Sequence, residues 1–437
     1  MSMDVYIGRQ PILDRAWNIA AYELLFRSGK NESCEGTDDV SATPQVISNA
    51  ATVFGLDRLL GDKPAFIRFD RTRLIGDWTT CLAPDKVVIE IVGTNPADQE
   101  TLTACERLNE LGYALALNDC LDDGRTEAFA PFVDILKVDF QQTSATDQES
   151  LIRRYKNLKL RMVACKVETE FEFVRASQLG YHYFQGFFFA SPTVLQTPKV
   201  PASQMGGLRL MKEVQKEELD LNTLEPLIRH DLAFSHSLLT YLNSANFNWK
   251  TRIESVRQGL IMLGTDQIRK WVWMATVSSL GQNRPPILMG QVLMRGRFCE
   301  EIASAGKLNM GDADPFLAGM FSLLDAILRR PLKDILDELN IGGVIRSALL
   351  GATDESDSLS RVLAIVKAYE RSDFQAVDAG ARAIHLSADV LNACYLRSLS
   401  WVESIHSNEE KTWRASHAAP LPGFHREAES RSRPFSA

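Results

Sequence analysis

Charged, amide and thiol side chains recur inside or just after short apolar segments in the first 190 residues. In chain order they are Glu23, Arg27, Arg68, Glu90, Asn118, Asp119, Lys137, Asp139, Cys165, Glu168 and Gln185. One such side chain in an apolar run is more often a hydrogen-bonded core group than part of a site. A whole set on consecutive segments instead favours a shared binding or catalytic site.

The segments that carry these residues alternate between short β-branched runs and longer runs with helical spacing, which predicts β/α units. The strand candidates are residues 4–12, 20–26, 64–69, 86–92, 113–118, 134–139, 161–167 and 181–189, the first two joined by a turn at 14–18. Eight strands within about 195 residues fit a (β/α)8 barrel in which a strand or helix is abbreviated. The site of such a barrel lies at the C-terminal ends of its strands.

Strand signals stop near residue 196, and residues 196–207 are predicted to be a linker because of their prolines and glycines. Helical patterns follow at 208–217, 223–230, 232–243, 255–263, 266–280, 287–305, 314–329, 332–350, 358–372 and 385–406. Residues 208–407 are therefore predicted to form an all-α domain. Residues 408–437 mix Pro, Ser, His and charges without periodicity, which predicts a disordered tail.

Composition restricts the function further. The 437 residues fit two or three domains, and 45% hydrophobic residues exclude a fibrous or largely disordered protein. The net charge of −8 disfavours nucleic acid as a partner. No apolar stretch reaches the roughly 18 residues that span a bilayer, and no signal peptide is recognisable. We therefore expect a cytoplasmic protein that does not bind a membrane.

The seven cysteines are odd in number and form no C-x-x-C pair. This pattern predicts reduced, mostly packed thiols rather than a disulfide framework or a zinc site.

Five motifs occur in a fixed order along the barrel region. They are Glu23-Leu24-Leu25-Phe26-Arg27, Leu117-Asn118-Asp119, Leu136-Lys137-Val138-Asp139, Cys165-Lys166-Val167-Glu168, and Gln185-Gly186-Phe187 with Pro192. This series resembles the E-A-L-x-R, D-D-F-G, K-x-D, E-G-V-E and Q-G-Y…P segments of EAL domains, which are bacterial cyclic di-GMP phosphodiesterases. The resemblance covers residues 4–192 and implies a modified (β/α)8 barrel whose ligand site is lined by the residues named above.

The resemblance also implies a site with two divalent cations that activate water for phosphodiester cleavage. Of its ligand positions, Glu23, Glu90 and Asp119 remain. The others have changed: the family's Asn is Arg68, its first Asp is Asn118 and its last Glu is Cys165. Two carboxylates are lost and one cation is gained, so we expect Mg²⁺ or Mn²⁺ binding and two-metal catalysis to be lost.

Arg68 suggests a specific hypothesis, in which its guanidinium takes the place of a metal ion and pairs with Glu23 or Glu90. Neutral drift after loss of activity is the alternative. The resemblance implies that Arg27 contacts a ligand phosphate, so metal-independent binding of cyclic di-GMP stays open. A redox or metal role is the alternative for Cys120 and Cys165. The family has a buried aromatic side chain at the Cys120 position, which favours a packed thiol there.

The helical region contains His230-Asp231, which looks like the doublet of HD metal-dependent phosphohydrolases. No histidine lies between residues 183 and 229 to complete such a site, so Asp231 is better explained as a helix cap. The segments 231–239, 242–245, 259–264 and 316–325 resemble HDOD domains, all-α relatives of HD hydrolases that generally lack the metal ligands. This second resemblance covers about residues 200–405.

Trp271 and Trp273 flank Val272 in one predicted helix, so they cannot share a face. Either both are core residues, or one is exposed and marks a partner surface.

Together, these features predict a non-catalytic bacterial signalling protein with a degenerate EAL barrel followed by an HDOD domain, acting through unidentified signalling proteins. A metal-independent cyclic di-GMP receptor is the alternative, and an active phosphodiesterase is less favoured. A homodimer is an expectation from the family alone.

Overall fold

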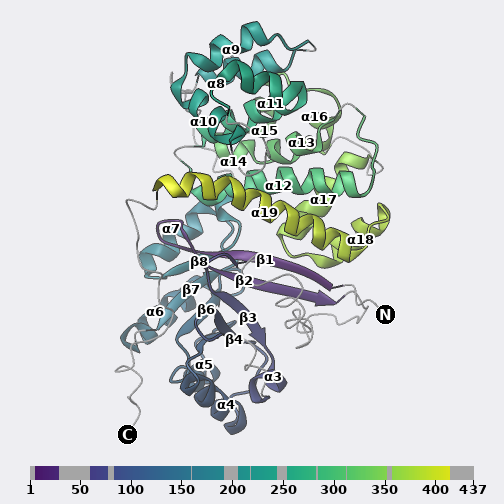
Figure 1. Cartoon of the computed structure of the whole chain (residues 1–437). Helices are drawn as coiled ribbons and strands as arrows, with labels where there is room; N and C mark the ends of the chain where they lie inside the picture. Colours follow the sequence, from purple (N-terminus) through teal and green to yellow (C-terminus); the bar gives the residue numbers. More distant parts are fainter. Residues whose placement is uncertain are drawn as a thin grey trace. The chain divides into compact units, whose positions relative to one another are not determined.

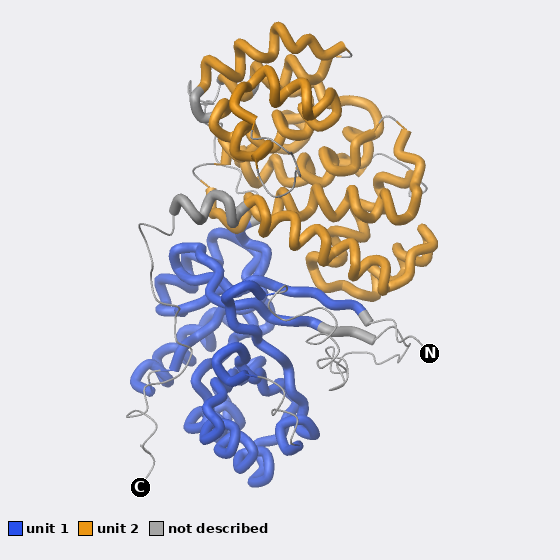
Figure 2. The backbone as a smooth tube through the Cα atoms, in the orientation of Figure 1, with its two compact units in different colours: residues 1–191, 420–437 blue, residues 192–419 orange. Residues whose placement is uncertain are grey.

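The computed structural model describes residues 5–28, 60–76, 83–158, 160–190, 205–216, 218–243, 253–281, 284–311, 313–351 and 357–413. The described residues fall into two compact units, which divide at residues 191 and 192 (Figure 2). Every described strand lies in the first unit, and the described part of the second unit is helical.

The first unit is a closed barrel of eight strands (Figure 1). The strands are β1 (Val5–Asp14), β2 (Ile19–Ser28), β3 (Ala65–Phe69), β4 (Val87–Ile91), β5 (Ala114–Leu117), β6 (Ile135–Asp139), β7 (Arg161–Cys165) and β8 (Tyr183–Gln185). Strand β1 is antiparallel to both β2 and β8, and the remaining neighbours are parallel. The prediction of a modified (β/α)8 barrel is confirmed.

The barrel is short because a hairpin replaces its first β/α unit. Asp14 Oδ1 accepts hydrogen bonds from the backbone N–H groups of Ala16 (2.8 Å) and Asn18 (2.9 Å), which closes the turn between β1 and β2. Such side-chain-to-backbone bonds are typical of Asp in turns. The turn residue Trp17 packs against Phe173, with ring centroids 4.6 Å apart.

Helices follow the parallel strands of the barrel: α3 (Arg71–Ile75), α4 (Gln99–Glu110), α5 (Gly124–Phe129), α6 (Ala145–Tyr155) and α7 (Glu170–Leu179). Single-turn 3₁₀ helices lie at Lys156–Leu158 and Phe188–Ala190. Helix α7 begins with a capping box, in which Thr169 and Glu172 satisfy each other's backbone N–H groups. Strand β4 is buried along its whole length, so its one charged residue, Glu90, must find partners inside the barrel.

The second unit contains α8 (Met205–Val214), α9 (Leu221–Arg229), α10 (Leu232–Leu242), α11 (Val256–Leu280), α12 (Pro286–Ala305), α13 (Pro315–Phe321), α14 (Leu324–Leu328), α15 (Leu332–Glu338), α16 (Gly343–Leu350), α17 (Ser358–Glu370), α18 (Phe374–Ala383) and α19 (Ala388–Trp413). The predicted helices 314–329 and 332–350 are each two helices. The two predicted at 255–263 and 266–280 form α11, which is interrupted at Gly264 (φ 74°).

Helix α18 was not predicted. It is short and rich in small residues, and only Phe374, Val377 and Ala381 mark its buried face. The weak apolar signal explains why the pattern was missed.

Two predicted boundaries also differ. Helix α8 includes residues 205–207 of the predicted linker, where Gly207 serves close packing: a Cβ there would lie 2.5 Å from Thr276 Cγ2. Helix α19 includes residues 408–413 of the predicted tail. Residues 196–204 and 414–437 lie outside the described residues.

Both tryptophans of α11 belong to the core. Trp271 is 2% exposed and Trp273 3%, and they contact Phe234 and Phe321 respectively. The alternative that one of them marks a partner surface is therefore wrong.

The helix-cap interpretation of Asp231 is confirmed, because its Oδ1 accepts a hydrogen bond from the N–H of Phe234 (3.2 Å). His230 beside it is exposed.

Cys105, Cys120, Cys165, Cys299 and Cys394 are free and buried, as predicted, whereas Cys34 and Cys81 lie outside the described residues. Among the described helices, none combines the length and apolarity that crossing a bilayer requires.

Helices α12 and α13 approach closely at Gly296 and Gly319. A Cβ on Gly319 would lie 2.7 Å from both Arg295 O and Gly296 Cα. We expect Gly319→Ala to lower the free energy of unfolding by about 1–3 kcal/mol in urea denaturation, because the helices must separate. The control is Gly342→Ala, where a Cβ meets nothing within 4 Å. Equal losses in the two variants would contradict this packing role.

Candidate functional site

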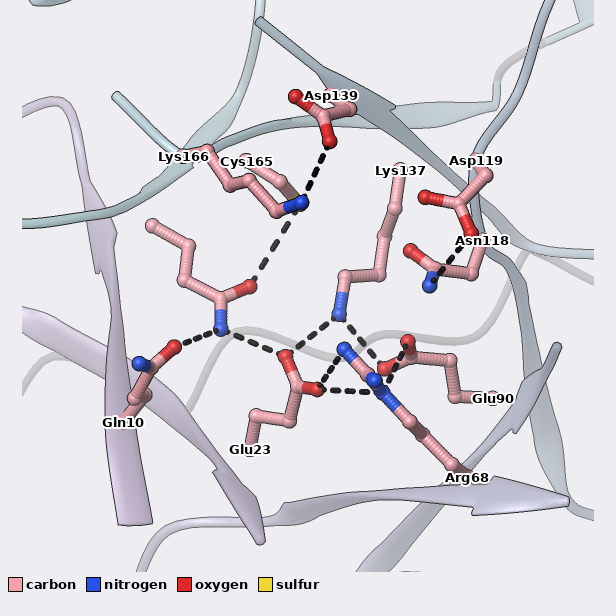
Figure 3. A network of polar contacts seen from close by, with 11 residues as sticks. Gln10, Glu23, Arg68, Glu90, Asn118, Asp119, Lys137, Asp139, Cys165 and Lys166 are labelled. Carbon is pink, nitrogen blue, oxygen red and sulfur yellow. Dashed lines mark hydrogen bonds and ion pairs between the residues drawn. The ribbon is translucent and has the colours of Figure 1, made fainter. Parts of the chain in front are cut away.

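Four charged side chains from four barrel strands meet inside the first unit (Figure 3). Lys137 Nζ on β6 lies 2.8 Å from Glu23 Oε2 on β2 and 2.6 Å from Glu90 Oε2 on β4. All three side chains are at most 1% exposed. Lys137 therefore bridges two buried carboxylates.

Arg68 on β3 contacts the other oxygens of the same carboxylates. Its Nε donates to Glu23 Oε1 (2.9 Å), its Nη2 lies 2.9 Å from that oxygen, and its Nε lies 3.4 Å from Glu90 Oε1. The parallel register places Arg68 beside Glu90 on the neighbouring strand. The predicted pairing of Arg68 with Glu23 or Glu90 is confirmed for both. That the guanidinium takes the place of a metal ion stays a hypothesis.

The pKa values of the two buried glutamates shift in opposite directions. Burial opposes ionisation of Glu23, but the charges of Lys137 and Arg68 outweigh it and lower the Glu23 pKa from 4.5 to about 2. Burial, together with the charge of Glu23, raises the pKa of Glu90. Burial opposes the charge on Lys137, but the two glutamates prevail and raise the Lys137 pKa. Glu90 Oε1 is buried and accepts no hydrogen bond from the described residues.

Gln185 on β8 extends the cluster. Its Nε2 donates to Glu23 Oε2 (2.6 Å) and to Gln10 Oε1 (3.0 Å). Its Oε1 accepts from Cys165 Sγ (3.6 Å). Burial raises the pKa of the Cys165 thiol to about 12, so this thiol is protonated at neutral pH and is a poor nucleophile and metal ligand.

Cys120 is buried, and its Sγ donates to Leu117 O (3.1 Å). Packing, the favoured interpretation of this residue, agrees with that contact.

Asn118 and Asp119 lie at the end of β5, where Asn118 Nδ2 donates to Asp119 Oδ2 (3.2 Å). Asp119 has a left-handed backbone (φ 51°), and a Cβ on Gly93 would lie 2.6 Å from its Oδ2. The absence of a side chain on Gly93 thus allows the Asp119 carboxylate its position.

Two predicted site residues, Glu168 and Arg27, are not seen in the buried cluster. The Glu168 side chain is exposed near the start of α7, so it is not part of the buried cluster. Arg27 lies in β2, but its side chain is outside the described part of the structure, as is the whole of Pro192.

Two further polar residues of this region, Gln10 and Lys166, were not predicted. Gln10 pairs with Glu23 in the β1–β2 register, so the hairpin could have revealed it. Lys166 has φ 54°, and its Nζ lies 2.9 Å from Asp139 Oδ2. No sequence signal indicated that pair, because Lys166 stands where the resembling motif has glycine.

These residues do not fit a pair of divalent cations. Mg²⁺ and Mn²⁺ favour carboxylate and carbonyl oxygens, but the oxygens of Glu23 and Glu90 already face Lys137 and Arg68. The described residues contain no group of three or more His, Cys, Asp or Glu side chains placed to hold a metal.

Comparisons with known families agree with this architecture. The EAL domain model matches residues 79–192, and the HDOD domain model matches residues 200–328. The chain therefore joins an EAL domain to a C-terminal HDOD domain.

Two relatives match nearly the whole chain. YuxH of Bacillus subtilis is 28% identical over 411 residues, covering 92% of this chain and 99% of that protein. The cyclic di-GMP phosphodiesterase CdgJ of Vibrio cholerae is 29% identical over 404 residues, covering 92% and 93%.

Among solved structures, an EAL domain protein of Listeria monocytogenes has 18% identity and a TM-score of 0.35, covering 43% of this chain and 87% of that one. BlrP1 of Klebsiella pneumoniae, in a complex with calcium and cyclic di-GMP, has 24% identity and a TM-score of 0.36, covering 43% and 55%.

Proposed function

We propose that this protein is a non-catalytic component of cyclic di-GMP signalling that acts through protein contacts of its EAL and HDOD domains. The observation that supports this proposal is the pairing of Glu23 and Glu90 with Lys137 and Arg68. Mg²⁺ or Mn²⁺ would have to displace a guanidinium from two buried carboxylates before it could activate water. We therefore propose that the protein uses no metal cofactor.

Two other functions have specific support. A metal-independent cyclic di-GMP receptor is favoured by the ion-pair cluster itself, because fixed cations hold the barrel's inner carboxylates in place without metal. Cyclic di-GMP could then shift the conformation of such a receptor only through a difference in its affinity for two conformations of the protein.

An active phosphodiesterase is favoured by the name of the relative CdgJ.

One titration separates these functions. Purified full-length protein is titrated calorimetrically with cyclic di-GMP in Mg²⁺, in Mn²⁺ and in EDTA, and the products are analysed for linear pGpG. Under the proposal, we expect no pGpG in any condition. Binding that survives EDTA and is lost in Arg27→Ala would identify a receptor, whereas pGpG that depends on metal would overturn the proposal.

A protein partner would be tested next. A candidate found by capture with the full chain should bind equally well with and without cyclic di-GMP if the protein is a scaffold. Binding that needs the nucleotide would instead support the receptor.

A further inference from the structure

A histidine side chain takes part in the backbone pairing between β7 and β8 (Figure 1). The N–H of His182 donates to Met162 O (2.9 Å), and the N–H of Met162 donates to His182 Nδ1 (3.1 Å). Both backbone groups of Met162 are therefore paired with one residue, the first through its main chain and the second through its imidazole. A ring nitrogen that accepts a hydrogen bond carries no proton, so the ring is neutral in this structure.

This contact is a substantial part of the pairing between the two strands. The chain leaves α7 at Gly180, whose left-handed backbone (φ 111°) ends the helix. Strand β8 is only three residues long, and its register with β7 comprises two residue pairs. The contact between His182 and Met162 comes directly before the first of these pairs and extends the short ladder by one position.

The groups around the ring oppose its protonation. Burial, and then the positive charges of Arg15 and Arg161, lower the pKa of His182 from 6.5. Both guanidinium groups are anchored to the residues on either side of His182. Arg15 Nε donates to Tyr181 O (2.9 Å), and Arg161 Nη1 donates to the hydroxyl of Tyr183 (2.8 Å).

Two carboxylates on adjoining elements accept hydrogen bonds elsewhere. Asp14, in the turn between β1 and β2, accepts from backbone N–H groups of that turn. Asp134, directly before β6, accepts from the N–H of Leu115 (3.0 Å). Protonation of His182 would therefore add a positive charge beside two arginines and remove the acceptor of the Met162 N–H. The ring is exposed, so protons reach it from solvent.

Strand β8 also carries a residue of the buried ion-pair cluster. Gln185 lies three residues after His182, and its Nε2 donates to Glu23 Oε2 (2.6 Å). The position of Gln185 depends on how β8 is held between β1 and β7. A loss of pairing at the start of β8 therefore weakens the support of this side of the cluster.

We propose that His182 is a pH-sensitive switch of strand β8. The neutral ring completes the pairing with β7, whereas the protonated ring releases the Met162 N–H and loosens the start of the strand. Because folding lowers the His182 pKa, its contribution to stability is present above pH 6.5 and is lost as the pH falls below that value. The proposal concerns neither nucleotide nor metal, so it does not depend on the function proposed above.

The test is hydrogen exchange of the Met162 amide in full-length protein labelled with ¹⁵N-methionine, measured by NMR at about pH 7.5 and about pH 5. After correction for the intrinsic exchange rate, we expect protection to fall at least about fivefold at the lower pH, because one hydrogen bond is lost. His182→Leu should show the lower protection at both pH values. His182→Asn should keep the higher protection at both, because its amide oxygen can accept from Met162 and does not titrate.

The matched control is His385→Asn, which replaces an exposed histidine of the second unit and should leave the pH dependence at Met162 unchanged. The amide of Met320, in α13, is the internal reference and should keep its protection at both pH values. Equal protection of Met162 at both pH values in the wild type would overturn the proposal. So would an equal loss in His182→Asn, or a parallel loss at Met162 and Met320, which would indicate global acid unfolding.

Discussion

Replacing Lys137 with methionine is expected to lower the free energy of unfolding by about 3–5 kcal/mol at pH 7. The reason is that Lys137 is the buried cation between Glu23 and Glu90, both of which are also buried. Methionine fills a similar volume but leaves two carboxylates with Arg68 as the remaining cation of the cluster. Urea denaturation followed by circular dichroism would measure the loss.

Two further variants give this prediction its control. Lys63→Met removes a lysine whose partner, Asp62, is 55% exposed, so we expect a loss below about 1 kcal/mol. Adding Glu90→Gln to Lys137→Met should recover part of the stability, because it leaves Arg68 paired with one carboxylate, Glu23, and so removes the uncompensated charge. A loss below about 1 kcal/mol in Lys137→Met, or no recovery in the double variant, would show that the cluster does not stabilise the barrel as described.

The second large effect concerns pH. The Glu23 pKa is about 2 in the folded protein and 4.5 when unperturbed, because Lys137 and Arg68 outweigh the effect of burial. A depressed carboxylate pKa stabilises the fold above the unfolded pKa, and this contribution is lost as pH falls from about 4.5 to about 2. At 1.36 kcal/mol per pKa unit, the contribution is roughly 3 kcal/mol.

Comparing the wild type with Glu23→Gln isolates this contribution. We expect the variant to be less stable by roughly 3 kcal/mol at pH 7, and the difference to close between pH 4.5 and 2. The raised Glu90 pKa acts in the opposite sense, since its contribution is present at low pH and is lost as pH rises. A stability difference that stays constant from pH 7 to pH 2 would contradict the ionised state of Glu23.

Mutual pairing by itself accounts for the four charged side chains inside this barrel. Removing one partner from a buried ion pair leaves an uncompensated charge, which costs more than the pair contributes. We therefore expect the cluster to tolerate replacements best when a cation and a carboxylate are removed together. Neutral drift is the alternative origin of Arg68, but in the folded barrel its side chain is paired with Glu23 and Glu90.

The sequence by itself determined the architecture and most of the site's composition. Alternating β-branched and helical patterns indicated eight strands followed by helices, since residue periodicity is a local property of the chain. The ordered motifs of the barrel indicated the EAL family, and the helical segments indicated the HDOD family. The residues Arg68, Asn118 and Cys165 at ligand positions predicted that metal binding had changed. The residues that meet in the cluster were all named except Gln10.

Tertiary structure alone decided which charges pair and which side chains are buried. Arg68 contacts both glutamates because the register of β2, β3 and β4 places them together. Lys166 reaches Asp139 through a left-handed backbone that its residue type does not predict. Glu168 is exposed, although its motif suggested a site residue. Such contacts depend on the distance between strands far apart in sequence, and a periodic pattern carries no information about that distance.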